Sequence, residues 1–118
     1  MPNLTLDDIH HAAARIAPFA VRTPVLRADT LDTAVGARVW FKCENLQRTG
    51  SFKFRGATNA VRSLDDSQAA RGVVAHSSGN HGAALAEAAR MRGIPAHIVV
   101  PDGATFAKVE AIRRAGAH

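Results

Sequence analysis

The chain has 118 residues, of which 47% are hydrophobic and 21% charged, with a formal net charge of +5. This composition predicts one small globular domain with a real core. The single cysteine, Cys43, excludes an internal disulfide framework and fits a reducing compartment. No apolar run approaches the roughly 20 residues of a membrane span, and the start of the chain lacks a signal-peptide pattern, so we expect a cytoplasmic protein without a membrane partner.

The positive charge raises the possibility of a nucleic-acid-binding surface. The arginines are scattered from Arg15 to Arg114, and no aromatic residues interleave with them as a stacking platform. We therefore interpret the basic residues as a solvated surface and expect no nucleic-acid partner.

The first half of the chain alternates helical and extended patterns. Thr5 is a suitable N-cap for a helix whose apolar periodicity ends at Pro18. The pattern then predicts an extended segment over 22–26, a short helix over 29–35 and a strand over 38–44.

The second half predicts regular alternation. Ser51 is a plausible N-cap for a helix over 52–64. Further strands are expected over 72–76 and 96–100, and further helices over 81–92 and 105–115. This order predicts an α/β fold with an open parallel sheet, right-handed crossovers and flanking helices. Residues 117–118 fall where a next strand would begin, so we expect the architecture to be incomplete within this chain.

One segment organises the chemistry, residues 49–56 (TGSFKFRG), which places Lys53 in the first turn of a predicted helix. The positive helix N-terminus and apolar neighbours both disfavour an ammonium ion. A neutral amine is the nucleophile needed to form a Schiff base. The structural alternative is an ordinary helix lysine whose amine reaches the solvent.

A second segment, residues 77–82 (SSGNHG), follows a predicted buried strand and opens the next helix. Such a turn exposes backbone N–H groups and suits a small anion such as a carboxylate. Three other interpretations exist for this segment. It could be a simple helix cap, it could place Ser77 on a nucleophile elbow as in serine esterases, or its G-x-x-G spacing could form an RNA-binding loop.

Taken together, these motifs resemble one family. Residues 42–57 are similar to the lysine segment of the threonine/serine dehydratases, which are fold-type II pyridoxal-phosphate enzymes that include serine racemase. Residues 77–82 match the substrate-carboxylate loop of that family, and residues 98–101 and 108–117 continue the pattern. The resemblance covers residues 16–118.

The resemblance implies a role for each motif residue. Lys53 would form the Schiff base with pyridoxal 5'-phosphate, with Phe52 beside the ring and Asn80 on the phenolic oxygen of the cofactor. The loop of Ser77, Ser78, Gly79, Asn80 and His81 would hold the carboxylate of an amino-acid substrate. Ser78 would lie on the opposite side of Cα from Lys53, where racemases have their second acid/base.

The implied activity is a lyase reaction. A threonine/serine ammonia-lyase converts a 3-hydroxy amino acid to a 2-oxo acid and ammonia, with the lysine amine as the base. The alternatives are a serine racemase of the same family and a serine esterase that uses Ser77. The resemblance further implies that residues 1–64 belong to the large cofactor domain and residues 65–118 to a truncated small α/β domain. Family members are longer, so we expect this chain to be inactive alone and the full-length protein to be a homo-oligomer.

Overall fold

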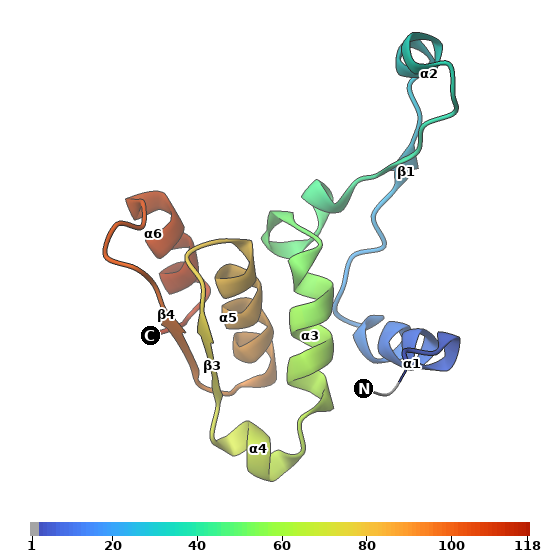
Figure 1. Ribbon diagram of the computed structural model, residues 1–118. Helices are drawn as coiled ribbons and strands as arrows, with labels where there is room; N and C mark the ends of the chain where they lie inside the picture. The colour runs from blue at the N-terminus through green and yellow to red at the C-terminus, as the bar shows by residue number, and fades with distance from the viewer. Residues whose placement is uncertain (1–2) are drawn as a thin grey trace.

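The computed structural model describes residues 3–118, with the side chain of Lys108 excepted (Figure 1). In chain order, the elements are α1 (Leu6–Ile16), β1 (Val25–Leu26), α2 (Asp29–Val35), β2 (Phe41–Lys42), the 3-10 turns η1 (Glu44–Leu46) and η2 (Arg48–Gly50), α3 (Lys53–Ser63), α4 (Asp66–Ala70), β3 (Val73–His76), α5 (Asn80–Arg92), β4 (Ala96–Val99) and α6 (Phe106–Arg114). None of the helices described is long and apolar enough to cross a membrane.

The first part of the chain combines α1 with an extended arm. The predicted cap of α1 is confirmed, because the Thr5 hydroxyl accepts a hydrogen bond from the Asp8 N–H and the Asp8 carboxylate accepts one from the Thr5 N–H. The arm consists of the antiparallel pair β1–β2 and carries α2 at its tip, away from the rest of the molecule (Figure 1). The strand expected over 38–44 is shorter than predicted, because η1 begins at Glu44 and leaves only Phe41–Lys42 paired with β1.

The second part contains the predicted parallel sheet. Strands β3 and β4 pair in parallel, with Val73 opposite Ala96 and His76 opposite Val99. His118 then lies beside β4, since its N–H donates to the Ala96 carbonyl at 3.0 Å and its carbonyl accepts from the Ile98 N–H at 2.9 Å. The expected strand start at residues 117–118 is therefore visible as backbone pairing.

Helix α5 lies between the sheet and α3 and forms the centre of the core (Figure 1). Phe54 and Val61 of α3 are its largest fully buried side chains. The buried face of α5 consists mostly of alanines, which let neighbouring elements approach closely. Such a core needs few large side chains, in agreement with the low aromatic content of the chain.

Helices α3 and α5 run in the same direction. At their C-terminal ends, the Arg92 guanidinium donates to the carbonyls of Val61 and Leu64, and the Arg62 guanidinium donates to the Met91 carbonyl. Their N-termini therefore lie at the opposite, common end of the pair (Figure 1). The hydrophobic core contains residues from both sides of position 64. The expected division of the chain into residues 1–64 and 65–118 stays a prediction.

One predicted cap is wrong. Phe52 takes the N-cap position of α3, and no side chain caps that helix. Ser51 is instead extended and only 7% exposed, and its hydroxyl is buried without a hydrogen-bond partner among the described residues. The turn η2 ends directly before Ser51 and directs its side chain into the interior, so it cannot reach the free N–H groups of α3.

Candidate functional site

The turn between β3 and α5 is organised by the hydroxyl of Ser77. The Ser77 N–H donates to the Val99 carbonyl at 3.0 Å and so extends the sheet by one residue. The Ser77 Oγ accepts hydrogen bonds from the N–H groups of Gly79 at 3.3 Å and Gly82 at 3.1 Å. Ser77 therefore closes the turn and positions the residues between these glycines.

Gly82 allows α5 to approach the sheet end closely. A Cβ atom at this position would lie 2.7 Å from the Ser77 carbonyl oxygen, 3.0 Å from Ile98 Cγ2 and 3.2 Å from Ile112 Cδ1. A side chain of any size would push the turn away from the sheet. The second glycine of the G-x-x-G spacing is thus explained by packing.

The geometry of Ser77 does not support the esterase alternative. A nucleophile elbow holds its serine hydroxyl exposed on a strained turn. Here the hydroxyl accepts two backbone hydrogen bonds, and Ser77 has no positive φ, which among the described non-glycine residues occurs at Thr49 alone.

Thr49 and Gly50 form a left-handed turn directly before α3, with φ values of 61° and 72°. A β-branched residue rarely adopts this conformation, and such outliers concentrate at functional sites. The turn η2, which contains both residues, contacts α5. Sequence reasoning included Thr49 in the lysine motif but gave it no role, and its backbone conformation carried no separate sequence signal.

A cavity of about 220 Å³ opens where η2, the start of α5 and α6 meet. Its lining contains three of the predicted loop residues, Ser78, Gly79 and Asn80. Four residues without a predicted role complete it, Thr49, Ala83, Ala107 and Ala111. The structure thus brings part of the predicted carboxylate loop to the wall of a small cavity, where the positive end of α5 favours an anion.

Lys53 begins α3 at the same end of the helix pair, but it does not line this cavity. Its side chain is exposed, and its Nζ lies 5.1 Å from the centroid of the Phe52 ring, which is itself 61% exposed. The expected desolvation of Lys53 is therefore not provided by the described residues, because the apolar neighbours on either side in sequence point elsewhere: Phe52 to the solvent and Phe54 into the core.

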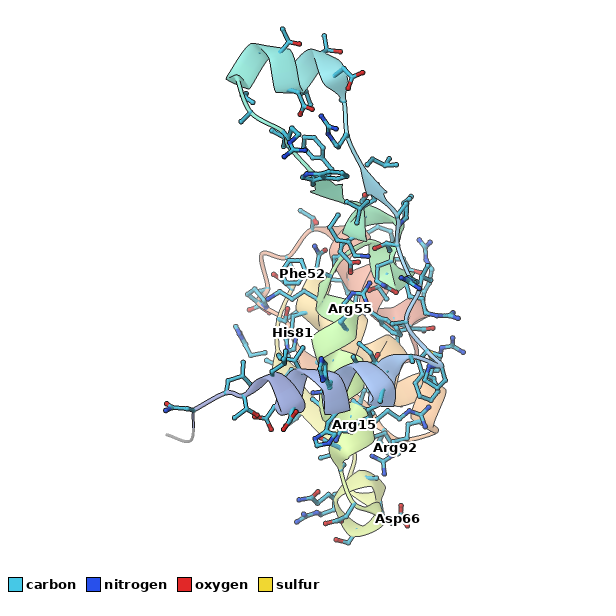
Figure 2. The ribbon with its side chains drawn as sticks, turned by 90° about the vertical axis from the view of Figure 1, so that its right-hand side faces the viewer. Arg15, Phe52, Arg55, Asp66, His81 and Arg92 are labelled. Atoms are coloured by element: carbon cyan, nitrogen blue, oxygen red, sulfur yellow. The ribbon has the colours of Figure 1, made fainter. Side chains whose placement is uncertain are left out.

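His81 is also exposed. In Figure 2, Phe52, Arg55 and His81 lie toward one end of α3, and Arg92 and Asp66 lie toward the other. An accessible primary amine fits a cofactor that carries an aldehyde, and the anion-favouring turn fits the carboxylate of an amino-acid substrate. The residues present are therefore compatible with pyridoxal phosphate.

A partly buried polar network, which sequence reasoning missed, supports the start of α3. The Arg55 guanidinium makes two hydrogen bonds to the Glu44 carboxylate, at 2.8 and 2.7 Å, and Glu44 also accepts from the Thr23 hydroxyl. Hydrogen bonding to Arg55 and then to Thr23 lowers the pKa of Glu44 to about 2. Gln47 is almost fully buried and bonds both the N–H and the carbonyl of Val21. These contacts hold the lysine segment against residues 21–23, which follow α1.

Comparison with known proteins identifies relatives of this chain. The chain is 56% identical over 110 residues to an L-threo-3-hydroxyaspartate ammonia-lyase from a Pseudomonas species, covering 93% of the chain and 34% of that protein. The structure of maize serine racemase superposes with a TM-score of 0.93 at 53% identity, covering 96% of this chain and 34% of the other. The structure of a threonine deaminase from T.th. gives a TM-score of 0.88 at 40% identity, covering 98% of this chain and 36% of the other.

These relatives confirm the predicted fold-type II α/β architecture and pyridoxal phosphate as the cofactor of the family. The chain spans about a third of the length of the curated relatives it matches. The model of a family described as pyridoxal-phosphate dependent enzyme matches residues 16–118, and the chain belongs to this family.

Proposed function

We propose that the protein is an ammonia-lyase that converts a 3-hydroxy amino acid, threonine or serine, to a 2-oxo acid and ammonia with pyridoxal phosphate as cofactor. The observation that carries the proposal is the common end of α3 and α5. It places the exposed amine of Lys53 and the turn of residues 77–82 at the N-termini of two packed parallel helices. The names of the relatives, which include a hydroxyaspartate ammonia-lyase and a threonine deaminase, support the same reaction class.

Three residues would hold the cofactor. Lys53 would bind it covalently through its amine, Phe52 would pack beside its ring, and the Asn80 amide would bond its phenolic oxygen. When bound, the cofactor supplies an electron-withdrawing ring that stabilises negative charge at the substrate Cα. The exposure of Phe52 and Asn80 leaves both side chains accessible for these contacts.

The turn from Ser77 to His81 would hold the substrate carboxylate. The N–H groups of Gly79 and Gly82 are directed to Ser77 Oγ, so Ser77 acts by shaping the turn. The carboxylate would then be bound by the Ser78 hydroxyl and by the N–H groups at the start of α5, including those of Asn80 and His81. The positive end of the α5 dipole favours the negative charge there.

The lyase and the racemase reactions differ in which groups transfer protons at the substrate Cα. For elimination, the Lys53 amine would remove the Cα proton and, as an ammonium, would pass that proton to the departing β-hydroxyl, which leaves as water. A racemase needs a second acid on the opposite face, and Ser78 would supply it. Serine racemase is the second candidate, because the chain is similar to serine racemases of rice and maize.

The cofactor assignment is tested on the protein expressed from its own gene and incubated with pyridoxal phosphate. Reduction with borohydride and peptide mass spectrometry should find the cofactor on Lys53, and Lys53→Ala should abolish the labelling. Lys42→Ala is the matched control and should keep the label on Lys53. The Lys42 amine of the native protein donates to the Thr23 carbonyl, so we expect no cofactor on it. Absence of label from Lys53 in the native protein overturns the proposal.

Ser78→Ala separates the two reactions. Racemisation of L-serine should fall by about 100-fold or more if Ser78 is the second acid. Formation of pyruvate from L-serine should fall by a smaller factor, since it loses one contact to the substrate carboxylate but keeps Lys53 as its base. If the native protein racemises serine without forming any 2-oxo acid, the lyase proposal is wrong and the racemase candidate replaces it.

Three further expectations stay proposals for the protein as a whole. We propose a homo-oligomer, a cytoplasmic location and no nucleic-acid partner. Analytical ultracentrifugation tests the oligomeric state, and cell fractionation tests the location. A filter-binding assay with RNA at two salt concentrations tests for a nucleic-acid partner.

A further inference from the structure

The first turn of α3 carries positive charge at the end of the helix that favours negative charge. Lys53 and Arg55 occupy its first and third positions without an acidic residue in that turn, and no side chain among the described residues caps it. Two cations are unfavourable beside the positive end of a helix dipole. Helices α1 and α4, by contrast, begin with a capping box and with acidic residues in the first turn. The helix start that carries Lys53 therefore lacks the usual local support.

Glu44 supplies the missing carboxylate from outside the helix. Its two oxygens accept hydrogen bonds from the Arg55 guanidinium at 2.8 and 2.7 Å, and the Thr23 hydroxyl donates to the same carboxylate at 2.5 Å. The pair is partly buried, with 15% of the Glu44 side chain and 33% of the Arg55 side chain exposed. A bidentate pair is stronger than neutral hydrogen bonds, and partial burial reduces its screening by salt. Glu44 thus neutralises one of the two cations at the start of α3.

The carbonyl oxygen of Val21 ties together the two ends of the lysine segment. It accepts one hydrogen bond from the Gln47 amide at 2.8 Å and another from the Arg55 guanidinium at 3.1 Å. Gln47 is almost fully buried, and its amide oxygen also accepts the Val21 N–H at 2.9 Å. Residues 47 and 55 are therefore anchored at one point, and Lys53 lies in the stretch of chain between them. Because the Lys53 side chain is exposed, the backbone between these anchors sets the position of its amine.

The backbone hydrogen bonds at the start of α3 are weak by themselves. The Phe54 N–H donates to the Ser51 carbonyl at 3.4 Å, and the Arg55 N–H donates to the Phe52 carbonyl at 3.1 Å. Both span three residues, as in a 3-10 helix, and such bonds have poorer geometry than those of a regular α-helix. Helix ends fray, and an end without a cap frays more easily. Fraying here would displace Lys53, because it is the first residue of the helix.

From these observations we infer that Glu44 and Arg55 are positioning residues for the Lys53 amine. This inference rests on the proposed function, in which Lys53 binds the cofactor and moves the Cα proton. A reacting group must be held in place, since a displacement of about 1 Å can cost about 100-fold in rate. The Glu44–Arg55 pair holds the helix start through the backbone, so neither side chain has to touch the cofactor or the substrate.

The test measures how fast pyridoxal phosphate, trapped with borohydride, labels Lys53 in the folded protein. Glu44→Gln and Arg55→Gln each remove the ion pair and should lower this rate by about tenfold. Peptide mass spectrometry assigns the label to Lys53. Native labelling rates in both variants would overturn the inference, while a labelled native protein would leave the proposed function standing.

Two controls separate positioning from stability. Glu87→Gln removes a bidentate pair of the same kind, since Arg90 bonds Glu87 at 2.9 and 2.8 Å on α5, and it should label at the native rate. Val61→Ala opens a cavity at a fully buried position of α3 and destabilises the same helix, and it should also label at the native rate. If Val61→Ala labels as slowly as Glu44→Gln, stability alone explains the effect and the inference is wrong.

Hydrogen exchange of the cofactor-free protein gives a readout that needs no reaction. In Glu44→Gln, the amides of residues 53–57 should exchange about tenfold faster or more, whereas those of residues 60–63 at the other end of α3 should keep their native protection. Unchanged exchange at residues 53–57 would overturn the inference. Absence of label from Lys53 in the native protein overturns the proposed function instead, and the exchange measurement then decides by itself whether Glu44 anchors the helix start.

Discussion

The hydroxyl oxygen of Ser77 accepts the N–H of Gly82 at 3.1 Å, and the Ser77 carbonyl oxygen would lie only 2.7 Å from a Cβ atom on the same glycine. The two residues therefore fix the turn between β3 and α5 from both sides. The turn can neither widen without losing the hydrogen bond nor accept a side chain at residue 82.

Gly82→Ala should destabilise the protein. The new methyl group would collide with backbone at Ser77 and with the side chains of Ile98 and Ile112. Overpacking of this kind costs about 1 to 3 kcal/mol in the free energy of unfolding, measured by chemical denaturation. Gly79→Ala is the control in the same turn, because a Cβ there meets nothing within 4 Å and φ is −128°, so its stability should stay close to native. Equal stability of the two variants would contradict this account of the turn.

The Glu44–Arg55 pair should make stability depend on pH in the acid range. The pKa of Glu44 is about 2 in the folded protein, below its ordinary value of 4.5. The stabilisation is therefore fully present above pH 4.5 and is lost as the pH falls toward 2, and it amounts to at most about 3 kcal/mol. Thermal unfolding of the native protein and of Glu44→Gln at several pH values measures it. The Glu44→Gln variant should be less stable at pH 7 and should lose less stability between pH 4.5 and 2. A parallel decline in both proteins would show that another group dominates.

Arg92 should contribute more to stability than its neighbour Arg90. The Arg92 guanidinium bonds the carbonyls that end α3, at Val61 and Leu64, and is mostly buried. Arg90 pairs with Glu87 on the surface of the same helix. Arg92→Ala should lower the free energy of unfolding by about 1 to 3 kcal/mol, since it leaves carbonyl groups unpaired. Arg90→Ala should change it by less than about 1 kcal/mol. Denaturant titration of both variants decides this, and a larger effect at Arg90 would refute the proposed link between α3 and α5.

Thr49→Asn should raise stability. Asparagine tolerates the left-handed backbone far better than a β-branched residue, so relief of the strain at φ 61° should add about 0.5 to 1 kcal/mol. Gly50→Ala provides the reciprocal variant, because residue 50 has a φ of 72° with open space around it. That substitution should cost about 1 kcal/mol through backbone strain alone. Thermal melts measure both changes, and a stabilising Gly50→Ala would show that the turn relaxes out of the left-handed region.

Local sequence signals predicted most of the elements. The N-cap at Thr5 acts within three residues, and the structure has it where the pattern predicts. Helices α2 and α5 also end through local signals, at the left-handed glycines Gly36 and Gly93. The alternation after residue 72 predicted the parallel pairing of β3 and β4. The failures occurred where distant contacts decide the outcome. Ser51 has the chemistry of a cap, but the turn η2 buries it.

The sequence by itself determined the family and the chemical groups available, because the lysine segment and the loop of residues 77–82 are contiguous and their residue types define their chemistry. Tertiary structure alone decided which of these groups share a space. The parallel packing of α3 and α5, held by Arg92 and Arg62 at one end, places both motifs at the other. It also places Thr49 and two alanines of α6 beside the loop, although sequence reasoning gave neither Thr49 nor these alanines a separate role. Proximity of this kind depends on crossovers and packing over tens of residues, which local propensity does not encode.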